Sequence, residues 1–249
     1  MFTTPLLVNI DRRSPLPEGC GFRYTNQDPA VPEVVECLAP PLPHGALTTL
    51  RLPVTAVDAA APTVSTYGIL SVLPAPGSAD TDTSATNSSL TTVFNIQQGP
   101  PQAVPAGSTP VDLYLVGDTP AISPGGTGMA TFSVGNSGPH PTSGTVRAVY
   151  VTPLFVNVDH RLPLPPECTM LLADADPSVP EIVQCVRTVP LSPHDTWSER
   201  IPLTVVPGGP QGQNFGTAIV TAGTPAAPGC DFETRLADNV FGPSVNTIA

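Results

Sequence analysis

The sequence predicts an all-β protein built from two tandem modules, and three observations support this prediction. A segment that begins at Pro5 returns at Pro153, a shift of 148 positions (153 − 5), and both copies keep the pattern Pro-Leu-x-Val-Asn-x-Asp. The 249 residues include 34 prolines and 21 glycines, which interrupt the chain too often for long helices. Several short segments alternate apolar and polar residues, as half-buried strands do. A period this long is typical of a repeated domain.

The second copy has the pattern of a complete β-sandwich. A first strand is expected at 111–116, and after a Pro-Gly turn a second is expected at 130–134, where Ala130, Phe132 and Val134 alternate with smaller residues. Further strands are expected at 146–158, 181–186, 198–206, 214–222 and 235–240. About seven short strands at this spacing favour an immunoglobulin-like sandwich. Pro202 lacks an amide hydrogen, which predicts a sheet edge or a bulge there.

The first copy lacks its beginning. Residue 1 corresponds to residue 149, so the copy has no counterpart of 111–148 and is short of about three strands. We therefore expect an incomplete immunoglobulin-like module at 1–98, a Pro/Gly-rich linker at 99–107 and a complete module at 108–249. An open half-sandwich exposes an apolar face and unpaired backbone groups. Three outcomes remain open: the missing strands lie upstream in a longer chain, another copy donates them, or residues 1–98 are poorly ordered.

Four of the five cysteines belong to the repeat. Cys20 and Cys37 are 17 positions apart (37 − 20), and so are Cys168 and Cys185 (185 − 168). Zinc and buried free thiols are the competing interpretations, but two disulfides are favoured because no tight Cys-x-x-Cys or regularly placed histidine accompanies the pairs. Each disulfide would stabilise the fold by about 3 kcal/mol. Cys230 has serine at its counterpart, Ser78, so it is expected to be a free thiol that either links two chains or has no role.

Disulfides indicate an oxidising compartment, so we expect an extracellular or cell-surface location. The first residues have neither the basic region nor the apolar run of a secretory signal. We therefore expect the chain to be a piece of a longer secreted protein, or its start to lie upstream.

Composition and motifs argue against several functions. The formal charge is −11 and the nine basic residues, all arginine, are scattered, so binding to nucleic acid is not expected. The sequence has no run of about 18 apolar residues, so membrane insertion is not expected. Gly-x-Ser-x-Gly, His-Glu-x-x-His and a phosphate-binding glycine loop are all missing, so we do not expect an enzyme.

Oxygen-bearing side chains in the two Cys-to-Cys loops suggest one metal hypothesis. Six residues occupy matching positions in the two copies: Asn26, Asp28 and Glu33, and Asp174, Asp176 and Glu181. Calcium binds such oxygen ligands, often weakly, in extracellular modules. The alternative is that Asp and Asn beside proline form ordinary turns, which is favoured because the glycine spacing of a calcium loop is missing. No other cofactor is expected.

A set of motifs in the second copy resembles a known family. A Pro-Gly turn precedes the strand at 130–134, Gly135-Asn136-Ser137-Gly138-Pro139 follows it, a proline-rich loop then holds one cysteine, a second cysteine opens a strand, and Ala237-Asp238-Asn239 lies near the end. This pattern resembles the bacterial surface-repeat family catalogued as domain of unknown function eleven. The resemblance covers Val111 to about Val240 and the truncated first copy. It implies tandem immunoglobulin-like sandwiches in exported or wall-attached proteins, which act as stalks or adhesive modules and carry no catalytic residues.

The sequence thus leads to two hypotheses for function. The first is a non-catalytic extracellular module pair that spaces or presents something at a bacterial surface. The alternative is a module that recognises a glycan or a protein through its end loops, with calcium as a possible aid. The residues at 243–249 contain no sorting signal, so wall attachment is unsupported. A second copy of the chain is one candidate partner, in a dimer formed by strand exchange or through Cys230.

Overall fold

The computed structural model describes residues 1–28, 30–44, 46–56, 64–72, 74, 89–96, 107–209, 211–222, 231–233 and 238–248. Every element within these residues is a β-strand, which confirms the expected all-β class. Cys230, most of the expected linker and the start of the expected strand at 235–240 lie outside the described residues. Within the described part, no helix has the length and hydropathy needed to cross a membrane.

The C-terminal half, residues 107–248, contains fourteen strands among its described residues. They are β8 (Thr109–Val111), β9 (Leu113–Gly117), β10 (Ala121–Ile122), β11 (Thr127–Asn136), β12 (Val146–Val151), β13 (Val156–Val158), β14 (Cys168–Leu172), β15 (Ile182–Arg187), β16 (Thr196–Val205), β17 (Gly212–Phe215), β18 (Thr217–Ala222), β19 (Asp231–Glu233), β20 (Val240–Phe241) and β21 (Ser244–Thr247). Two main sheets have the orders β13-β16-β11-β9 and β14-β15-β12-β18-β20. Smaller sheets join β10-β21-β17 and β19-β8.

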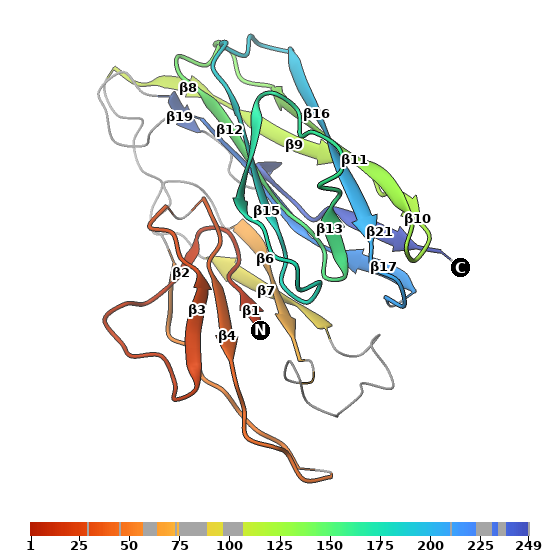
Figure 1. The fold of residues 1–249 in the computed structure, drawn as a ribbon. Helices are drawn as coiled ribbons and strands as arrows, with labels where there is room; N and C mark the ends of the chain where they lie inside the picture. The colour runs from red at the N-terminus through yellow and green to blue at the C-terminus, as the bar shows by residue number, and fades with distance from the viewer. Residues whose placement is uncertain are drawn as a thin grey trace.

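The two main sheets face each other and enclose an apolar core (Figure 1). Alternate residues of each strand point inward, so Phe132 and Val134 of β11 meet Tyr150 of β12 in the buried cluster. Phe132 lies parallel to Tyr150, with ring centroids 6.4 Å apart, and packs edge-on against Trp197 at 6.3 Å. The C-terminal half is therefore a two-layer β-sandwich.

The prediction of a single strand at 146–158 is wrong in one respect. The chain leaves the five-stranded sheet after β12, turns at 152–155 and enters the four-stranded sheet as β13. Pro153 cannot donate to a ladder, and Phe155 adopts a positive φ of 63°. Leu7, the counterpart of Phe155, has a φ of 65°, so both copies make the same turn. The alternating apolar pattern continues through the turn, which is why the sequence predicts one strand at 146–158.

The expectation that Pro202 marks a sheet edge or a bulge is also wrong. Strand β16 lies between β11 and β13, and Pro202 stands opposite Met129 in an unbroken register. The carbonyl of Pro202 accepts a hydrogen bond from the Asp159 amide on the β13 side (2.9 Å). A strand residue directs its N–H and its C=O to the same side, so the missing N–H faces the end of β13 and costs no bond to β11.

The N-terminal half, residues 1–96, repeats part of this architecture. Its strands are β1 (Phe2–Thr3), β2 (Val8–Ile10), β3 (Cys20–Tyr24), β4 (Val34–Cys37), β5 (Val54–Ala56), β6 (Val64–Ser71) and β7 (Ser89–Ile96). The order β3-β4-β1-β6-β7 matches β14-β15-β12-β18-β20 of the other half. The irregularity between Phe22 and Tyr24 also recurs, between Met170 and Leu172. The repeat in sequence is therefore a repeat in structure.

The second sheet of the N-terminal half is only a fragment. Within the described residues β5 pairs with β2 alone, whereas its counterpart β16 pairs with both β13 and β11. Residues 46–53, which precede β5, form no strand, although the equivalent part of β16 pairs with β11. Among the described residues, no strand covers the inner face of the five-stranded sheet of this half as β9 and β11 do in the other half.

The two halves pack back to back (Figure 1). The outward side chains of β12, β15 and β18, including Val149, Ile182 and Ile219, form a buried cluster with Leu6 and Val34 of the N-terminal half. Val34 points away from its own inner face, because its neighbour Val35 occupies the position of the core residue Val183. The contact between halves thus buries the outer faces of both sheets, an arrangement that the sequence had not suggested. As far as the structure describes the chain, the inner face of the N-terminal half stays open.

Candidate functional site

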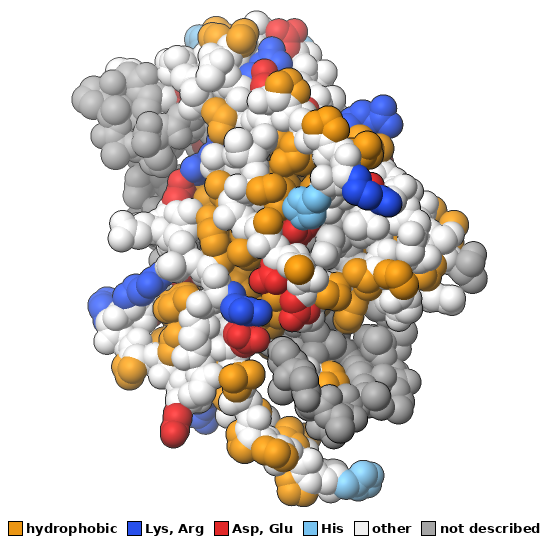
Figure 2. Space-filling view, viewed as in Figure 1, with side chains coloured by type: hydrophobic (Ala, Val, Ile, Leu, Met, Phe, Trp, Pro, Cys, Tyr) orange, Lys and Arg blue, Asp and Glu red, His pale blue; other side chains and the backbone are white. Residues whose placement is uncertain are grey.

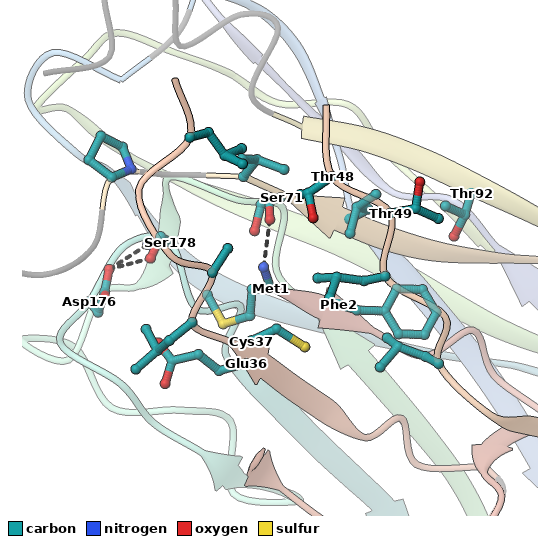
Figure 3. A pocket seen from close by; sticks show the side chains of 18 of the residues that line it. Met1, Phe2, Glu36, Cys37, Thr48, Thr49, Ser71, Thr92, Asp176 and Ser178 are labelled. Atoms are coloured by element: carbon teal, nitrogen blue, oxygen red, sulfur yellow. Dashed lines mark hydrogen bonds between the residues drawn. The ribbon is translucent and has the colours of Figure 1, made fainter. Parts of the chain in front are cut away.

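An apolar groove runs along that open inner face (Figure 3). Its volume is about 1380 Å³, and most of its lining comes from β1, β4, β6, β7 and the segment between β4 and β5. Apolar residues that line it are Met1, Phe2, Leu38, Leu42, Leu50, Leu52, Val54, Leu70, Val72 and Phe94. The C-terminal half adds one wall through Phe155 and the turn at 176–178. The groove is therefore a long apolar surface bounded by both halves.

The floor of the groove corresponds to a sandwich core. At the shift of 148, Phe2 and Leu70 match Tyr150 and Ala218, which are core residues of the C-terminal half. The strand pairing agrees, since Phe2 stands opposite Leu70 as Tyr150 stands opposite Ala218. In the C-terminal half β9 and β11 cover these positions. In the part of the chain that the structure describes, the groove is the same face with no counterpart of those two strands.

The wall formed by residues 38–54 is unusually exposed for its composition. Leu38 is 60% exposed, Leu50 48% and Val72 on the neighbouring strand end 68%. Figure 2 shows hydrophobic side chains along the loop that extends at the bottom of the view, which Figure 1 places between β4 and β5. Burial of large apolar side chains is favourable by about 1.5–3 kcal/mol each, so an exposed row of them marks an unfilled contact surface.

Polar residues also line the groove: Glu36, Thr48, Thr49, Ser71, Thr92, Asp176 and Ser178. The Met1 ammonium donates a hydrogen bond to the Ser71 carbonyl (2.5 Å). Burial lowers the pKa of this ammonium, and the Glu36 carboxylate opposes the shift. Ser178 donates its hydroxyl to Asp176 Oδ1 (2.6 Å) at the other rim. This hydrogen bond is local to the turn at 176–178, where Asp176 Oδ1 also accepts the Ser178 amide (2.9 Å).

The two glutamates proposed as metal ligands are engaged inside the protein. Glu181 is fully buried, and its Oε2 accepts the Val158 amide. Its Oε1 is hydrogen-bonded to His160 Nε2 (2.7 Å) and accepts the Asp174 amide (3.2 Å). These bonds hold the Cys-to-Cys loop against the strand β13.

Glu33, the buried glutamate of the other copy, makes equivalent hydrogen bonds. It accepts the Ile10 amide through Oε2 (2.7 Å), and its Oε1 pairs with Arg12, the counterpart of His160. Each carboxylate therefore serves as an acceptor for protein N–H groups on both of its oxygens.

The remaining four candidates form turns. Asn26 and Asp28 accept the amides of Asp28 and Ala30 (both 2.9 Å). Asp174 accepts the Asp176 amide (3.0 Å), and Asp176 accepts the Ser178 amide (2.9 Å). These are the short-range bonds of Asx turns. Over the described ranges, no three His, Cys, Asp or Glu side chains come together as a metal site.

The paired cysteines lie opposite each other on neighbouring antiparallel strands. Cys20 faces Cys37 and Cys168 faces Cys185, each with a Cα–Cα distance of 3.9 Å, and both pairs are disulfide-bonded. Each bond ties the outer strand of its five-stranded sheet, β3 or β14, to the next strand. The structure thus makes the two pairs that their equal spacing favours.

One interaction between the halves had no sequence signal. Asp28, singled out as a possible ligand, instead forms a salt bridge with Arg147 of β12. Burial acts to raise the pKa of Asp28, but the hydrogen bond from Arg147, the Ala30 amide and the charge of Arg147 together lower it below its ordinary value. Sequence reasoning missed Arg147 because the two residues are 119 positions apart and belong to different copies.

No protein-family profile matches the chain, and no curated protein matches it in sequence. Its fold resembles several solved structures. An uncharacterised protein from Nocardia farcinica with an immunoglobulin-like fold is 18% identical, with a TM-score of 0.32, over 56% of this chain and 99% of that one. The protein CaCohA2 from Clostridium acetobutylicum is 11% identical, with a TM-score of 0.33, over 57% and 96%. AvmM, which catalyses macrocyclisation in alchivemycin A biosynthesis, is 14% identical, with a TM-score of 0.31, over 56% and 89%. Similarities this low give no information on activity or partners.

Proposed function

We propose that the protein is a non-catalytic structural module of an exported bacterial protein, where it acts as a rigid spacer or presents an adhesive surface. In this proposal it belongs with the surface repeats catalogued as domain of unknown function eleven. Residues 108–249 form a complete immunoglobulin-like module and residues 1–98 an incomplete one. The two-layer sandwich at 107–248 and the repeated strand order support this arrangement.

One observation supports the proposal most directly: the same charged side chains occur in both copies, and in both copies they form structural hydrogen bonds or salt bridges. Glu33 and Glu181 make matching hydrogen bonds, and so do the Asp11–Arg13 and Asp159–Arg161 pairs. A catalytic site needs a group that is free to exchange protons or attack a substrate. Carboxylates that already accept hydrogen bonds from backbone amides are suited to holding loops in place, so the proposal assigns no catalytic residue.

The two disulfides support an extracytoplasmic location. Such bonds persist in oxidising compartments and are rare in the cytosol of mesophiles. Each closes a loop of 17 positions and, in the chain-entropy model, stabilises the fold by about 3 kcal/mol. Together with the buried contact between the halves, they would keep the module stiff outside the cell.

A binding module is the second candidate function, and the open groove is the observation that favours it. A surface spacer does not require an exposed apolar row such as Leu38, Leu42 and Leu50. In this version the protein would recognise a glycan or another protein.

Three measurements on the full chain test the proposal. Mass spectrometry of natively isolated protein should find four of its five cysteines in disulfides. The melting temperature should be the same in millimolar calcium and in chelator, and a glycan array should give no signal. Five reduced cysteines would refute the extracellular location. A calcium-dependent rise in melting temperature, or a specific glycan signal, would favour the binding module.

A further inference from the structure

We propose that His160 and Glu181 form a pH-sensitive latch on the Cys-to-Cys loop of the C-terminal half. The latch holds residues 173–181 most firmly while the imidazole is protonated. It loosens as the pH rises through the range in which histidine loses its charge, about 5 to 8. This inference goes beyond the spacer role and does not depend on it, because every side chain involved lies within residues 107–209, which the structure describes without a gap.

The buried carboxylate of Glu181 is the centre of the latch. Its side chain has no exposed surface, whereas the side chain of His160 is 52% exposed. Oε2 accepts the Val158 amide of β13, while Oε1 accepts the Asp174 amide of the loop (3.2 Å) and contacts His160 Nε2 (2.7 Å). One carboxylate thus ties the loop to the four-stranded sheet. A buried charge is costly unless an opposite charge compensates it, so the protonation state of the imidazole matters for this contact.

The other charged groups around His160 have partners of their own. Asp159 accepts two hydrogen bonds from the Arg161 guanidinium, from Nε (2.7 Å) and Nη2 (3.0 Å). The side-chain hydrogen bond from Arg161 is the main cause of a lowered pKa at Asp159; burial opposes the shift, and the charge of His160 adds to it. The Asp174 carboxylate accepts a backbone amide within its own turn. Asp159 is therefore balanced by Arg161, whereas the charged side chain paired with Glu181 is His160.

The N-terminal half contains the same network with a permanent charge. Asp11 and Arg13 form the matching ion pair, and Glu33 is fully buried. The position of His160 is taken by Arg12, whose guanidinium pairs with Glu33. Arginine keeps its charge throughout the range in which histidine titrates. The two copies thus differ at the cation of the network, and the copy with histidine is the one that responds to pH.

Protonation of His160 strengthens the latch. The imidazolium donates a charge-assisted hydrogen bond to Glu181, and such a bond is roughly twice as strong as a neutral one. A neutral imidazole still donates when its proton is on Nε2, so the loop keeps its place but opens more often. The stabilisation is present at about pH 5 and is lost as the pH rises towards about 8, because the stabilising form is the protonated one.

Hydrogen exchange on the full chain at about pH 5 and about pH 8, corrected for the intrinsic exchange rates, tests the proposal. The amides of Val158 and Asp174 should lose protection by about threefold to tenfold at the higher pH, as a charge-assisted bond becomes a neutral one. His160→Arg, which copies Arg12, should keep the higher protection at both pH values. His160→Gln, which is never charged, should show the lower protection at both. Residue 160 is half exposed, so both variants should fold.

His140→Gln is the matched control for the loss of a histidine. His140 is exposed, lies in the loop after β11 and is no part of the network, so this variant should keep the wild-type dependence on pH. Equal protection of the wild-type loop at the two pH values, or higher protection at the higher one, would overturn the proposal. A dependence on pH that persists in His160→Gln would overturn it as well, because another group would then be responsible.

Discussion

At the scale of single residues, the buried glutamates explain most of the repeated sequence pattern. Glu181 accepts hydrogen bonds from Val158 and Asp174 amides, which come from the two segments that it joins. Its own amide donates to the Thr152 hydroxyl (2.9 Å), as the Glu33 amide does to Thr4 (2.8 Å). Each copy therefore has a Thr-Pro pair after β1 or β12 and a Pro-Glu pair before β4 or β15. The two pairs recur together because the glutamate of the second pair is hydrogen-bonded to the threonine of the first.

Replacing Glu181 with alanine should destabilise the protein by about 2–4 kcal/mol. The change removes the acceptor of the buried Val158 amide and of the partly buried Asp174 amide, and an unsatisfied buried group costs about 1–3 kcal/mol. Urea unfolding followed by tryptophan fluorescence, which reports on Trp197, measures the loss. Glu167→Ala is the matched control, since that residue is exposed and should change stability by less than about 0.5 kcal/mol. Equal effects of the two substitutions would show that the buried bonds are unimportant.

At the scale of elements, the close approach of the chain between β17 and β18 to strand β12 depends on a glycine. A side chain at Gly216 would place its Cβ 2.3 Å from the Val151 carbonyl oxygen, and one at Gly68 would lie 2.8 Å from that of Thr3. These glycines hold matching positions in the two copies, where a strand passes close to the backbone of β12 or β1. Only glycine permits this approach without a shift of the backbone.

Gly216→Ala should therefore lower stability by about 1–3 kcal/mol, the usual cost of overpacking a tight site. In a chain of this size that corresponds to a fall of roughly 2–12 °C in melting temperature, measured by circular dichroism. Gly21→Ala is the control, because an added Cβ there meets no atom within 4 Å. This control should be neutral or slightly stabilising, since alanine loses less backbone entropy on folding. A Gly216→Ala protein that melts like the wild type would contradict the close approach.

At the scale of the whole molecule, the back-to-back contact makes the two halves depend on each other. Val149 and Val151 on the outer face of β12 are buried by residues such as Leu6 and Val31. The Asp28–Arg147 salt bridge lies at the same contact. Each five-stranded sheet is thus protected on its outer face by the other half, and the N-terminal half, with its open groove, gains most from this cover.

The wild-type chain should consequently unfold in a single calorimetric transition. Val149→Asp places an unpaired charge in the contact, which is unfavourable unless the halves separate. We expect this variant to show two transitions, with the N-terminal half melting first. Val116→Asp, at a half-exposed position on β9, should keep the single transition. One unshifted transition in Val149→Asp would mean that the contact contributes nothing to stability.

The sequence predicts much of the local structure because its signals are local. Alternation identifies β11, and the equal cysteine spacing matches the two disulfides. The continuous apolar pattern at 146–158 predicted one strand where there are two. The pattern does not show that Phe155 takes a positive φ and moves the chain to the other sheet. The six oxygen-bearing residues suggested calcium because a sequence shows ligand types but not the amides they already bind.

By itself, the sequence determined that the protein is all-β and that one pattern of residues occurs twice. These properties follow from residue periodicity and spacing, which do not depend on distant contacts. Only the tertiary structure decided that the halves join through their outer faces and that an apolar groove stays open on the inner one. The reason is that side chains on both faces of β12 are apolar, Val149 outward and Tyr150 inward, and a linear pattern cannot say what covers each face.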